Sequence, residues 1–199
     1  MTKHERTWDE RLKINTGGRD DTRSDEYRYP YEPTPYCVLE RLAESGLIGA
    51  GDTVLDYGCG KGRVGFFLSA QTGARSIGIE YDERICEEAE ENRKRAAAGE
   101  KTALVQARAE TYAVPGEVSV CYFFNPFSVE ILRGVMARIL ESYYAAPRGM
   151  YLLFYYPSDE YVSYLMTVEE LEFCDEIMCE DLFPGRDTRE RILIFELPA

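Results

Sequence analysis

The chain has 199 residues, of which 45% are apolar and 13% aromatic, and its 23 Lys and Arg against 36 Asp and Glu give a net charge of −13. A chain of this length and composition can bury one core, so we expect residues 1–199 to form a single domain. The excess of negative charge repels nucleic-acid phosphates and anionic lipids, which leaves small molecules or proteins as the expected partners. Because neither a signal peptide nor an apolar run of about 20 residues is present, we expect a cytoplasmic protein without a membrane anchor.

The first part of the chain differs in composition from the rest. Residues 1–26 are polar and charged, although Trp8 and its apolar neighbours can pack as a short helical piece. Residues 27–36 are dense in tyrosine and proline, which favours an extended backbone. We therefore expect an arm at residues 1–36 in front of a core at residues 37–199. The pattern leaves open whether the arm caps the active site or contacts another subunit, and it predicts no oligomeric state.

Beyond residue 50, short apolar runs alternate with helical periodicity. The pattern predicts strands at residues 53–57, 76–80, 103–106, 118–124, 150–156, 172–182 and 191–197, and helices at residues 37–48, 64–72, 82–98 and 128–145. Strands that alternate with helices form a mostly parallel sheet, whereas the last two strands have a turn between them and no helix. The predicted fold is thus an α/β three-layer sandwich. Its mostly parallel seven-stranded sheet ends in a C-terminal antiparallel hairpin, and helices cover both faces.

A glycine-rich turn follows the first predicted core strand. Asp56 lies near the carboxyl end of this strand, and Gly58, Gly60 and Gly62 follow at every second position. Ligands of doubly wound sheets bind at the carboxyl ends of the strands, where glycine lets the backbone approach a ligand closely. Glu80 ends the next strand, where its carboxylate can accept both hydroxyls of a ribose.

Two nucleotide-binding interpretations compete for this turn. Residues 60–65 match G-x-G-x-x-G, which by itself is weak evidence for an NAD(P)-dependent oxidoreductase. The alternative is Asp-x-Gly-x-Gly-x-Gly over residues 56–62, in which Asp56 balances a cationic ligand and repels a pyrophosphate. A P-loop is excluded because Gly62, and not Ser or Thr, follows Lys61.

The second pattern resembles the class I, seven-strand, Rossmann-like S-adenosylmethionine-dependent methyltransferases. Tyr81 and Asp82 continue as the adenosine-side loop of that family does, and residues 106–110 stand where its adenine-contacting loop lies. Residues 123–127, Phe-Phe-Asn-Pro-Phe, are similar to the family's Asn/Asp-Pro-Pro-aromatic motif, although Phe127 replaces the second proline. The likeness covers residues 38–197. The lead-in before residue 37 is also similar to that of some non-SET protein-lysine methyltransferases.

The resemblance implies S-adenosylmethionine as the cofactor and S-adenosylhomocysteine as the product. It also implies a set of cofactor-binding residues: Thr34, Asp56, Gly58, Cys59, Gly60, Gly62, Arg63, Glu80, Tyr81, Ala109, Glu110 and Asn125. Within this set, Arg63 either meets the cofactor carboxylate or forms a structural ion pair. Cys59 is better explained as a small side chain in a tight turn than as a nucleophile.

We expect three residues to serve catalysis on the acceptor side. The Asn125 amide can orient a substrate nitrogen, Tyr31 can line the acceptor pocket, and Tyr36 can lie near the methionine end of the cofactor. A small-molecule acceptor is favoured because the chain has no extra recognition domain; a protein lysine comes second and RNA third. Besides the oxidoreductase, a non-catalytic protein that keeps the methyltransferase fold remains an alternative.

Histidine and cysteine set limits on other chemistry. His4 is the only histidine, which excludes Ser-His-Asp triads and histidine-based metal sites from the core. The six cysteines are dispersed without a Cys-x-x-Cys motif, so we expect buried free thiols and no metal. The chemistry must therefore rest on backbone groups, carboxylates and aromatic rings.

Overall fold

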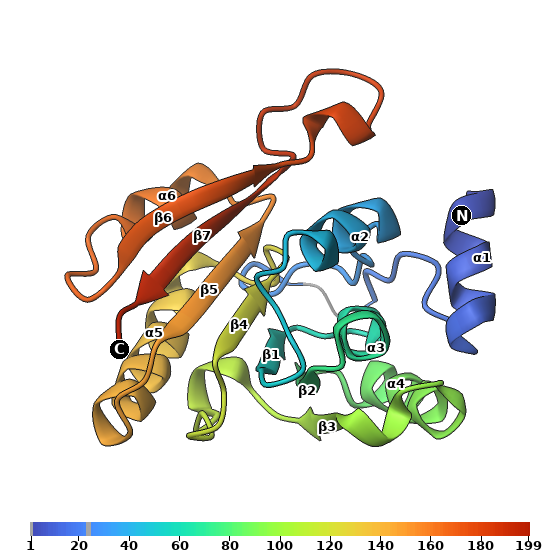
Figure 1. The fold of residues 1–199 in the computed structure, drawn as a ribbon, viewed down its shortest axis with the longest axis horizontal. Coiled ribbons are helices and arrows are strands. Elements are labelled where there is room, and N and C mark those ends of the chain that lie inside the picture. Colours follow the sequence, from blue (N-terminus) through green and yellow to red (C-terminus); the bar gives the residue numbers. More distant parts are fainter. Residues whose placement is uncertain (1, 23–24) are drawn as a thin grey trace.

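A seven-stranded sheet forms the middle layer of the computed structural model, which describes residues 2–22 and 25–199 (Figure 1). The strands are β1 (Thr53–Tyr57), β2 (Arg75–Glu80), β3 (Thr102–Gln106), β4 (Val120–Phe123), β5 (Met150–Tyr155), β6 (Glu172–Met178) and β7 (Arg191–Leu197). Their order is β3-β2-β1-β4-β5-β7-β6. The first five strands are parallel, and β7 is antiparallel to both β5 and β6. The predicted mixed sheet is thus confirmed.

Helices cover both faces of this sheet. On one face lie α1 (Lys3–Leu12), α2 (Tyr36–Glu44) and α3 (Arg63–Thr72), which share an apolar cluster with β1, β4, β5 and β7. On the other lie α5 (Val129–Ala145) and α6 (Asp159–Leu165). The remaining helix, α4 (Glu83–Arg95), packs on β2 and β3. Three short 3₁₀ turns complete the fold: η1 (Gly99–Lys101), η2 (Ala109–Thr111) and η3 (Glu180–Leu182).

Local sequence explains why the core elements form where they do. The apolar stripe of α5 (Leu132, Val135, Met136 and Ile139) is fully buried against the sheet, as its helical spacing predicts. All four residues of β4 are buried because helices cover both of its faces. Because β4 pairs in parallel with β1, the carboxyl ends of these two strands lie side by side.

Some boundaries differ from the prediction for physical reasons. The helix expected at residues 82–98 ends at Arg95, because Ala96 is extended and the Ala97 N–H donates to the carbonyl of Leu12 at 3.2 Å. The N-terminal segment contains a regular helix, α1, and α6 was not predicted. With seven residues, α6 is too short to show clear periodicity.

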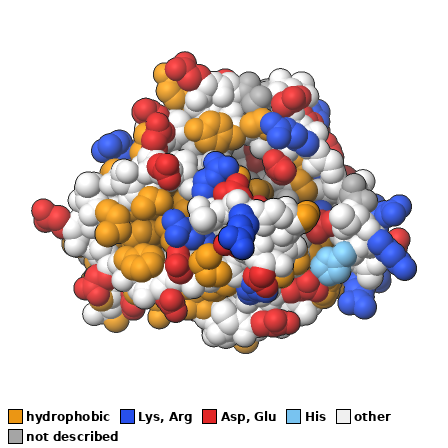
Figure 2. All heavy atoms as spheres, turned by 90° about the horizontal axis from the view of Figure 1, so that it is seen from above, with side chains coloured by type: hydrophobic (Ala, Val, Ile, Leu, Met, Phe, Trp, Pro, Cys, Tyr) orange, Lys and Arg blue, Asp and Glu red, His pale blue; other side chains and the backbone are white. Residues whose placement is uncertain are grey.

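The cysteines are free thiols, but Cys174 is exposed and Cys37 and Cys86 are half-buried, which corrects the expectation that all are buried. No helix within residues 2–22 and 25–199 is long and apolar enough to cross a bilayer. Over the same described part of the chain, no three His, Cys, Asp or Glu side chains group as metal ligands. Figure 2 shows charged side chains spread over the face seen from above, with basic ones gathered beside His4, at the end where α1 lies.

Candidate active site

A cavity opens at the carboxyl ends of β1 and β2, where the sheet order reverses between β1 and β4. Its walls come from the N-terminal arm, the glycine turn after β1, the end of β2 and the segments after β3 and β4. Most of the predicted site residues line it: Tyr31, Thr34, Asp56, Gly58, Cys59, Arg63, Glu80, Tyr81, Ala109 and Glu110. Gly60, Gly62, Tyr36 and Asn125 do not.

The glycine turn is shaped by what approaches it. Gly58 has a φ of +72°, and a Cβ there would lie 2.6 Å from the Cβ of Pro126, in the loop after β4. Gly60 has a φ of +53°, and a Cβ there would lie 2.1 Å from the Tyr31 ring. Any side chain at either position would therefore push the arm or the β4 loop away. The glycines after Asp56 allow three segments, distant in sequence, to meet at the cavity.

Asp56 is a buried carboxyl with spare hydrogen-bonding capacity. Its side chain is 3% exposed, and its Oδ2 atom has no hydrogen-bond partner. Burial raises the pKa of Asp56 to about 8, with a smaller contribution from the negative charge of Glu80. A buried polar atom without a partner is costly, so this position fits a ligand that brings positive charge or a donor.

Glu80 is held by the backbone around it. Its carboxylate accepts N–H groups from Gly60 at 2.9 Å and from Tyr81 and Asp82, both at 2.8 Å. Burial nevertheless raises its pKa, while these amides act in the opposite direction. A carboxylate has about four acceptor positions, so at least one remains for a ligand hydroxyl.

Beyond Glu80, three side chains form the far wall of the cavity. The guanidinium of Arg28 lies 4.4 Å from the centroid of the Tyr81 ring, and its Nη2 atom lies 3.4 Å from a carboxylate oxygen of Glu110. Ala109, in η2, borders the same wall. Arg28 was not predicted as a site residue, because a lone arginine in an irregular arm carries no sequence signal.

The arm forms a wall over the glycine turn. The Tyr31 hydroxyl donates to the carbonyl of Thr16 at 2.6 Å, and its ring packs on Gly60. Thr34 and Tyr122 share a hydrogen bond between their hydroxyls at 3.2 Å, and both line the cavity. Tyr122 was not predicted as a site residue either, because in the sequence it cannot be distinguished from any other buried residue of a strand.

Asn125 and Tyr36 lie outside the cavity lining. Asn125 follows β4 with a φ of +41°, and its Oδ1 is buried without a hydrogen-bond partner. Tyr36 is fully buried in α2 and donates its hydroxyl to Asp9 at 2.6 Å. A tyrosine sealed behind the arm cannot reach a substrate, so its position argues against the predicted catalytic role. Asn125 stands between Phe124 and Pro126, which both line the cavity, and it keeps an unused acceptor.

Cys59 and Arg63 have mainly structural partners. Burial raises the pKa of the Cys59 thiol well above its ordinary value, and a Cβ on Gly78 would lie 2.7 Å from its sulfur. This packing supports the interpretation of Cys59 as a small residue in a tight turn. Arg63 donates hydrogen bonds to the N-terminal segment and forms a structural ion pair there, one of the two roles weighed from the sequence.

Comparison with known proteins agrees with this geometry. The family model described as a methyltransferase domain matches residues 54–145, slightly less than half of the chain. A curated protein-lysine N-methyltransferase from Saccharolobus islandicus is 38% identical over 60 residues, which are 29% of this chain and 37% of that protein. The matched part thus spans little more than a third of this relative's length.

Solved structures share the fold. An RNA methyltransferase from Salinibacter ruber, in complex with S-adenosylhomocysteine, aligns with a TM-score of 0.52 and 20% identity over 84% of this chain and 94% of its own. A TehB-like methyltransferase from Corynebacterium glutamicum aligns with a TM-score of 0.60 and 18% identity over 81% of this chain and 88% of its own. At such identities the likeness concerns the fold alone.

The sheet order, the glycine turn and the matched segment are those of the class I, Rossmann-like methyltransferase fold. The family model matches residues 54–145, and a solved structure that shares the fold is an S-adenosylmethionine-dependent methyltransferase, in agreement with the resemblance drawn from residues 38–197. The matched family binds S-adenosylmethionine, which favours the methyltransferase interpretation over the oxidoreductase. The residues present fit that cofactor: Asp56 offers an unpaired oxygen, and Glu80 keeps an acceptor for a ribose hydroxyl.

Proposed function

We propose that this protein transfers a methyl group from S-adenosylmethionine to an amine nitrogen, with the lysine side chain of a protein as acceptor. The carboxyl-rich lining of the cavity carries the proposal. Six carboxyl side chains line it (Asp20, Glu32, Asp56, Glu80, Asp82 and Glu110), against two arginines. Such a lining favours a cationic cofactor and a cationic acceptor, and it disfavours phosphate groups.

Each wall of the cavity suits one part of the cofactor. When bound, S-adenosylmethionine supplies a methyl group activated by its sulfonium charge. Asp56 would balance positive charge beneath the glycine turn, and Glu80 would accept hydroxyls of the ribose. Arg28 and Tyr81 would close the adenosine side. Much of the rate of such a transfer comes from holding the two reacting atoms in line, an effect worth up to about 7–11 kcal/mol.

An amine acceptor needs less help from the protein than a hydroxyl acceptor does. A hydroxyl needs a general base, whereas an amine attacks once it has lost the proton of its ammonium form. Burial raises the pKa of the Tyr31 and Tyr122 hydroxyls, which keeps both protonated at neutral pH, so neither phenol serves as a base. The Oδ1 of Asn125, buried and unpaired, offers an acceptor for an amine N–H.

Two further observations support a protein lysine over other acceptors. The curated relative is named as a protein-lysine N-methyltransferase, and the net charge of −13 attracts a lysine-rich surface. RNA as the acceptor draws support from the structural relative of Salinibacter ruber, but the acidic cavity would repel its phosphates. A small-molecule amine shares the reacting group with lysine and is separated from it by experiment.

The acceptor is tested with methyl-labelled S-adenosylmethionine and three probes: a synthetic lysine-rich peptide, free lysine and total tRNA. We expect label in the peptide. Label confined to free lysine would move the acceptor to small amines, and label confined to tRNA would overturn the amine proposal. Binding of S-adenosylhomocysteine without transfer to any of the three probes would support the non-catalytic alternative.

Asn125→Gly tests the role of the amide. Glycine tolerates the positive φ at this position, so the change removes the side chain without adding backbone strain. We expect transfer to fall about 100-fold, while affinity for S-adenosylhomocysteine stays within twofold. Unchanged transfer would remove Asn125 from the proposal.

A further inference from the structure

Arg63, the first residue of α3, places a buried guanidinium between the glycine turn and the N-terminal arm. It is 2% exposed. Its Nε donates to the Thr16 hydroxyl at 2.7 Å, and its Nη1 donates to the carbonyl of Thr34 at 3.1 Å. The same Nη1 donates to a carboxylate oxygen of Glu5, in α1. One side chain therefore contacts three separate points of the N-terminal segment.

The partners of Arg63 are themselves bound to one another. The second carboxylate oxygen of Glu5 accepts the N–H of Tyr36 at 2.9 Å, at the start of α2. Asp9 accepts the Tyr36 hydroxyl at 2.6 Å and the Thr16 N–H at 2.9 Å, and one of its oxygens lies 3.8 Å from Arg63 Nη2. The Tyr36 ring packs 4.1 Å from the guanidinium carbon. Two acidic side chains of α1 thus share one arginine in a buried cluster.

The cluster is connected to the cavity through Thr16 and Thr34. Thr16, which Arg63 contacts through its hydroxyl, accepts the Tyr31 hydroxyl at its carbonyl, and the Tyr31 ring packs on Gly60. Thr34, which Arg63 contacts through its carbonyl, meets Tyr122 through its hydroxyl. Tyr31 is thus held through its hydroxyl and its ring, and Thr34 through its carbonyl and its hydroxyl.

From these contacts we propose that Arg63 is a positioning residue for methyl transfer. It fastens α1 and the cavity-lining part of the arm to the glycine turn, and so holds the wall against which cofactor and acceptor are placed. The link to methyl transfer rests on the proposed function, whereas the fastening of the arm stands on the contacts alone. Lysine is a poor replacement, because a point charge cannot serve Thr16, Thr34 and Glu5 in one planar arrangement.

Direct binding of the cofactor carboxylate is the competing role, because Nη2 makes no hydrogen bond. Two ligands separate the roles. S-adenosylhomocysteine carries an amino-acid carboxylate, and 5′-methylthioadenosine lacks the amino-acid part. If Arg63 acts through the wall, Arg63→Lys weakens both ligands by a similar factor. If it binds the carboxylate, only S-adenosylhomocysteine is affected.

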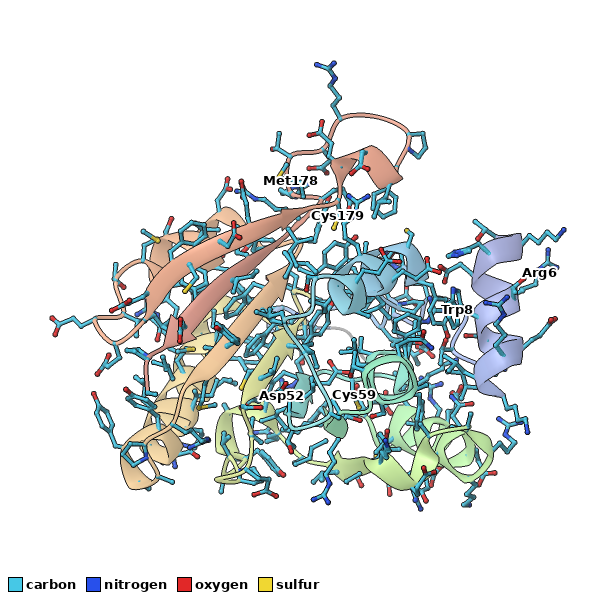
Figure 3. All side chains as sticks on the ribbon, in the orientation of Figure 1. Arg6, Trp8, Asp52, Cys59, Met178 and Cys179 are labelled. Atoms are coloured by element: carbon cyan, nitrogen blue, oxygen red, sulfur yellow. The ribbon has the colours of Figure 1, made fainter. Side chains whose placement is uncertain are left out.

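Trp8 gives a direct readout of the arm. It is the only tryptophan of the chain, lies 4.9 Å from the Phe67 ring of α3, and donates its indole N–H to Glu40 at 2.8 Å. Figure 3 shows Trp8 on the inner side of α1, with Arg6 turned outward. Release of α1 would expose Trp8 to water and shift its emission to longer wavelength.

The experiment compares the wild type with Arg63→Lys, and with Arg138→Lys as the matched control. Arg138 pairs with Glu141 on the exposed side of α5, where such a pair contributes little. For Arg63→Lys we expect red-shifted Trp8 emission, faster trypsin cleavage after Arg19, and about tenfold weaker binding of both ligands. At saturating S-adenosylmethionine, kcat per folded molecule should also fall, which a loss of stability alone would not produce. The control should match the wild type in every readout.

Three results would overturn the proposal: selective loss of S-adenosylhomocysteine binding, an unchanged arm in Arg63→Lys, or a released arm with unchanged affinity and kcat. Glu5→Gln weakens the same link from the arm and keeps the test valid if Arg63→Lys fails to fold. If the wild type binds neither ligand, the proposed function fails, while Trp8 emission and trypsin cleavage still test the fastening.

Discussion

Asp56→Asn tests whether burial in the cavity opposes ionisation of the Asp56 carboxyl. The substitution keeps the size of the side chain and removes the ionisable proton. Because burial, aided by Glu80, raises the pKa of Asp56 from 3.8 to about 8, the fold opposes ionisation of this group. We therefore expect two effects of opposite sign: a more stable protein without cofactor, and weaker binding of S-adenosylhomocysteine.

The size of the first effect follows from the two pKa values. At pH 7 the carboxyl is ionised in the unfolded state and mostly protonated in the folded state. The free energy of unfolding at pH 7 is therefore about 4 kcal/mol lower than it is below pH 4. Because the folded-state pKa is the higher one, the stability that the Asp56 carboxyl contributes is fully present below about pH 4 and is lost as the pH rises to about 8. Asparagine avoids that loss, but its amide hydrogens need acceptors, which costs about 1–3 kcal/mol. We expect a net gain of about 1–3 kcal/mol at pH 7.

Urea unfolding between pH 5 and pH 8 measures this effect, with the surface variant Glu141→Gln as control. The free energy of unfolding should fall with pH more steeply in the wild type than in Asp56→Asn, by up to about 1.4 kcal/mol per pH unit. Calorimetry over the same range should show S-adenosylhomocysteine binding the wild type more tightly as the pH approaches 8, with little change for Asp56→Asn. If Asp56→Asn is less stable at pH 7 and both proteins share one pH slope, Asp56 is ionised and paired, and the reasoning is refuted.

Three other substitutions test the packing around the site. Gly60→Ala should abolish detectable binding of S-adenosylhomocysteine in calorimetry, because the new Cβ would meet the Tyr31 ring at 2.1 Å; Tyr31→Ala in the same chain should restore part of it. Tyr36→Phe should lower the free energy of unfolding by about 1–3 kcal/mol, since Asp9 loses a buried donor, and should leave the pH–rate profile of methyl transfer unchanged; a shifted profile would return Tyr36 to catalysis. Leu132→Ala should cost about 2–5 kcal/mol in urea unfolding, because Leu132 is fully buried under α5, and a smaller loss would mean that the core collapses around the gap.

The sheet and its main helices could be predicted because their signals are local. The predicted strand at residues 53–57 coincides with β1, and the apolar stripe of α5 is buried as expected. Short elements and helix ends carried less information. The end of α4 depends on a contact between Ala97 and Leu12, which are 85 positions apart, so no window of sequence could reveal it.

The residues around the cavity likewise fall into those that local sequence predicted and those that it did not. Asp56, the alternating glycines and Glu80 were recognisable because they stand at fixed spacings after two strands, where a parallel sheet gathers its ligand-binding groups. Tyr36 looked equally suitable, yet its hydroxyl faces Asp9 behind the arm. Arg28 joined the site without any motif, because only the path of the arm brings it to Tyr81.

The sequence by itself thus determined the seven strands, the main core helices, the glycine turn and the acidic character of the protein. These follow from periodicity, backbone freedom and charge, which each residue carries wherever it lies. Only the tertiary structure decided which polar groups share a buried space. It joined Arg63 to Glu5 and Thr34, and it left an oxygen of Asp56 without a partner. Hydrogen bonding and desolvation depend on neighbours brought together by folding, and for this reason the roles of these residues could not be seen along the chain.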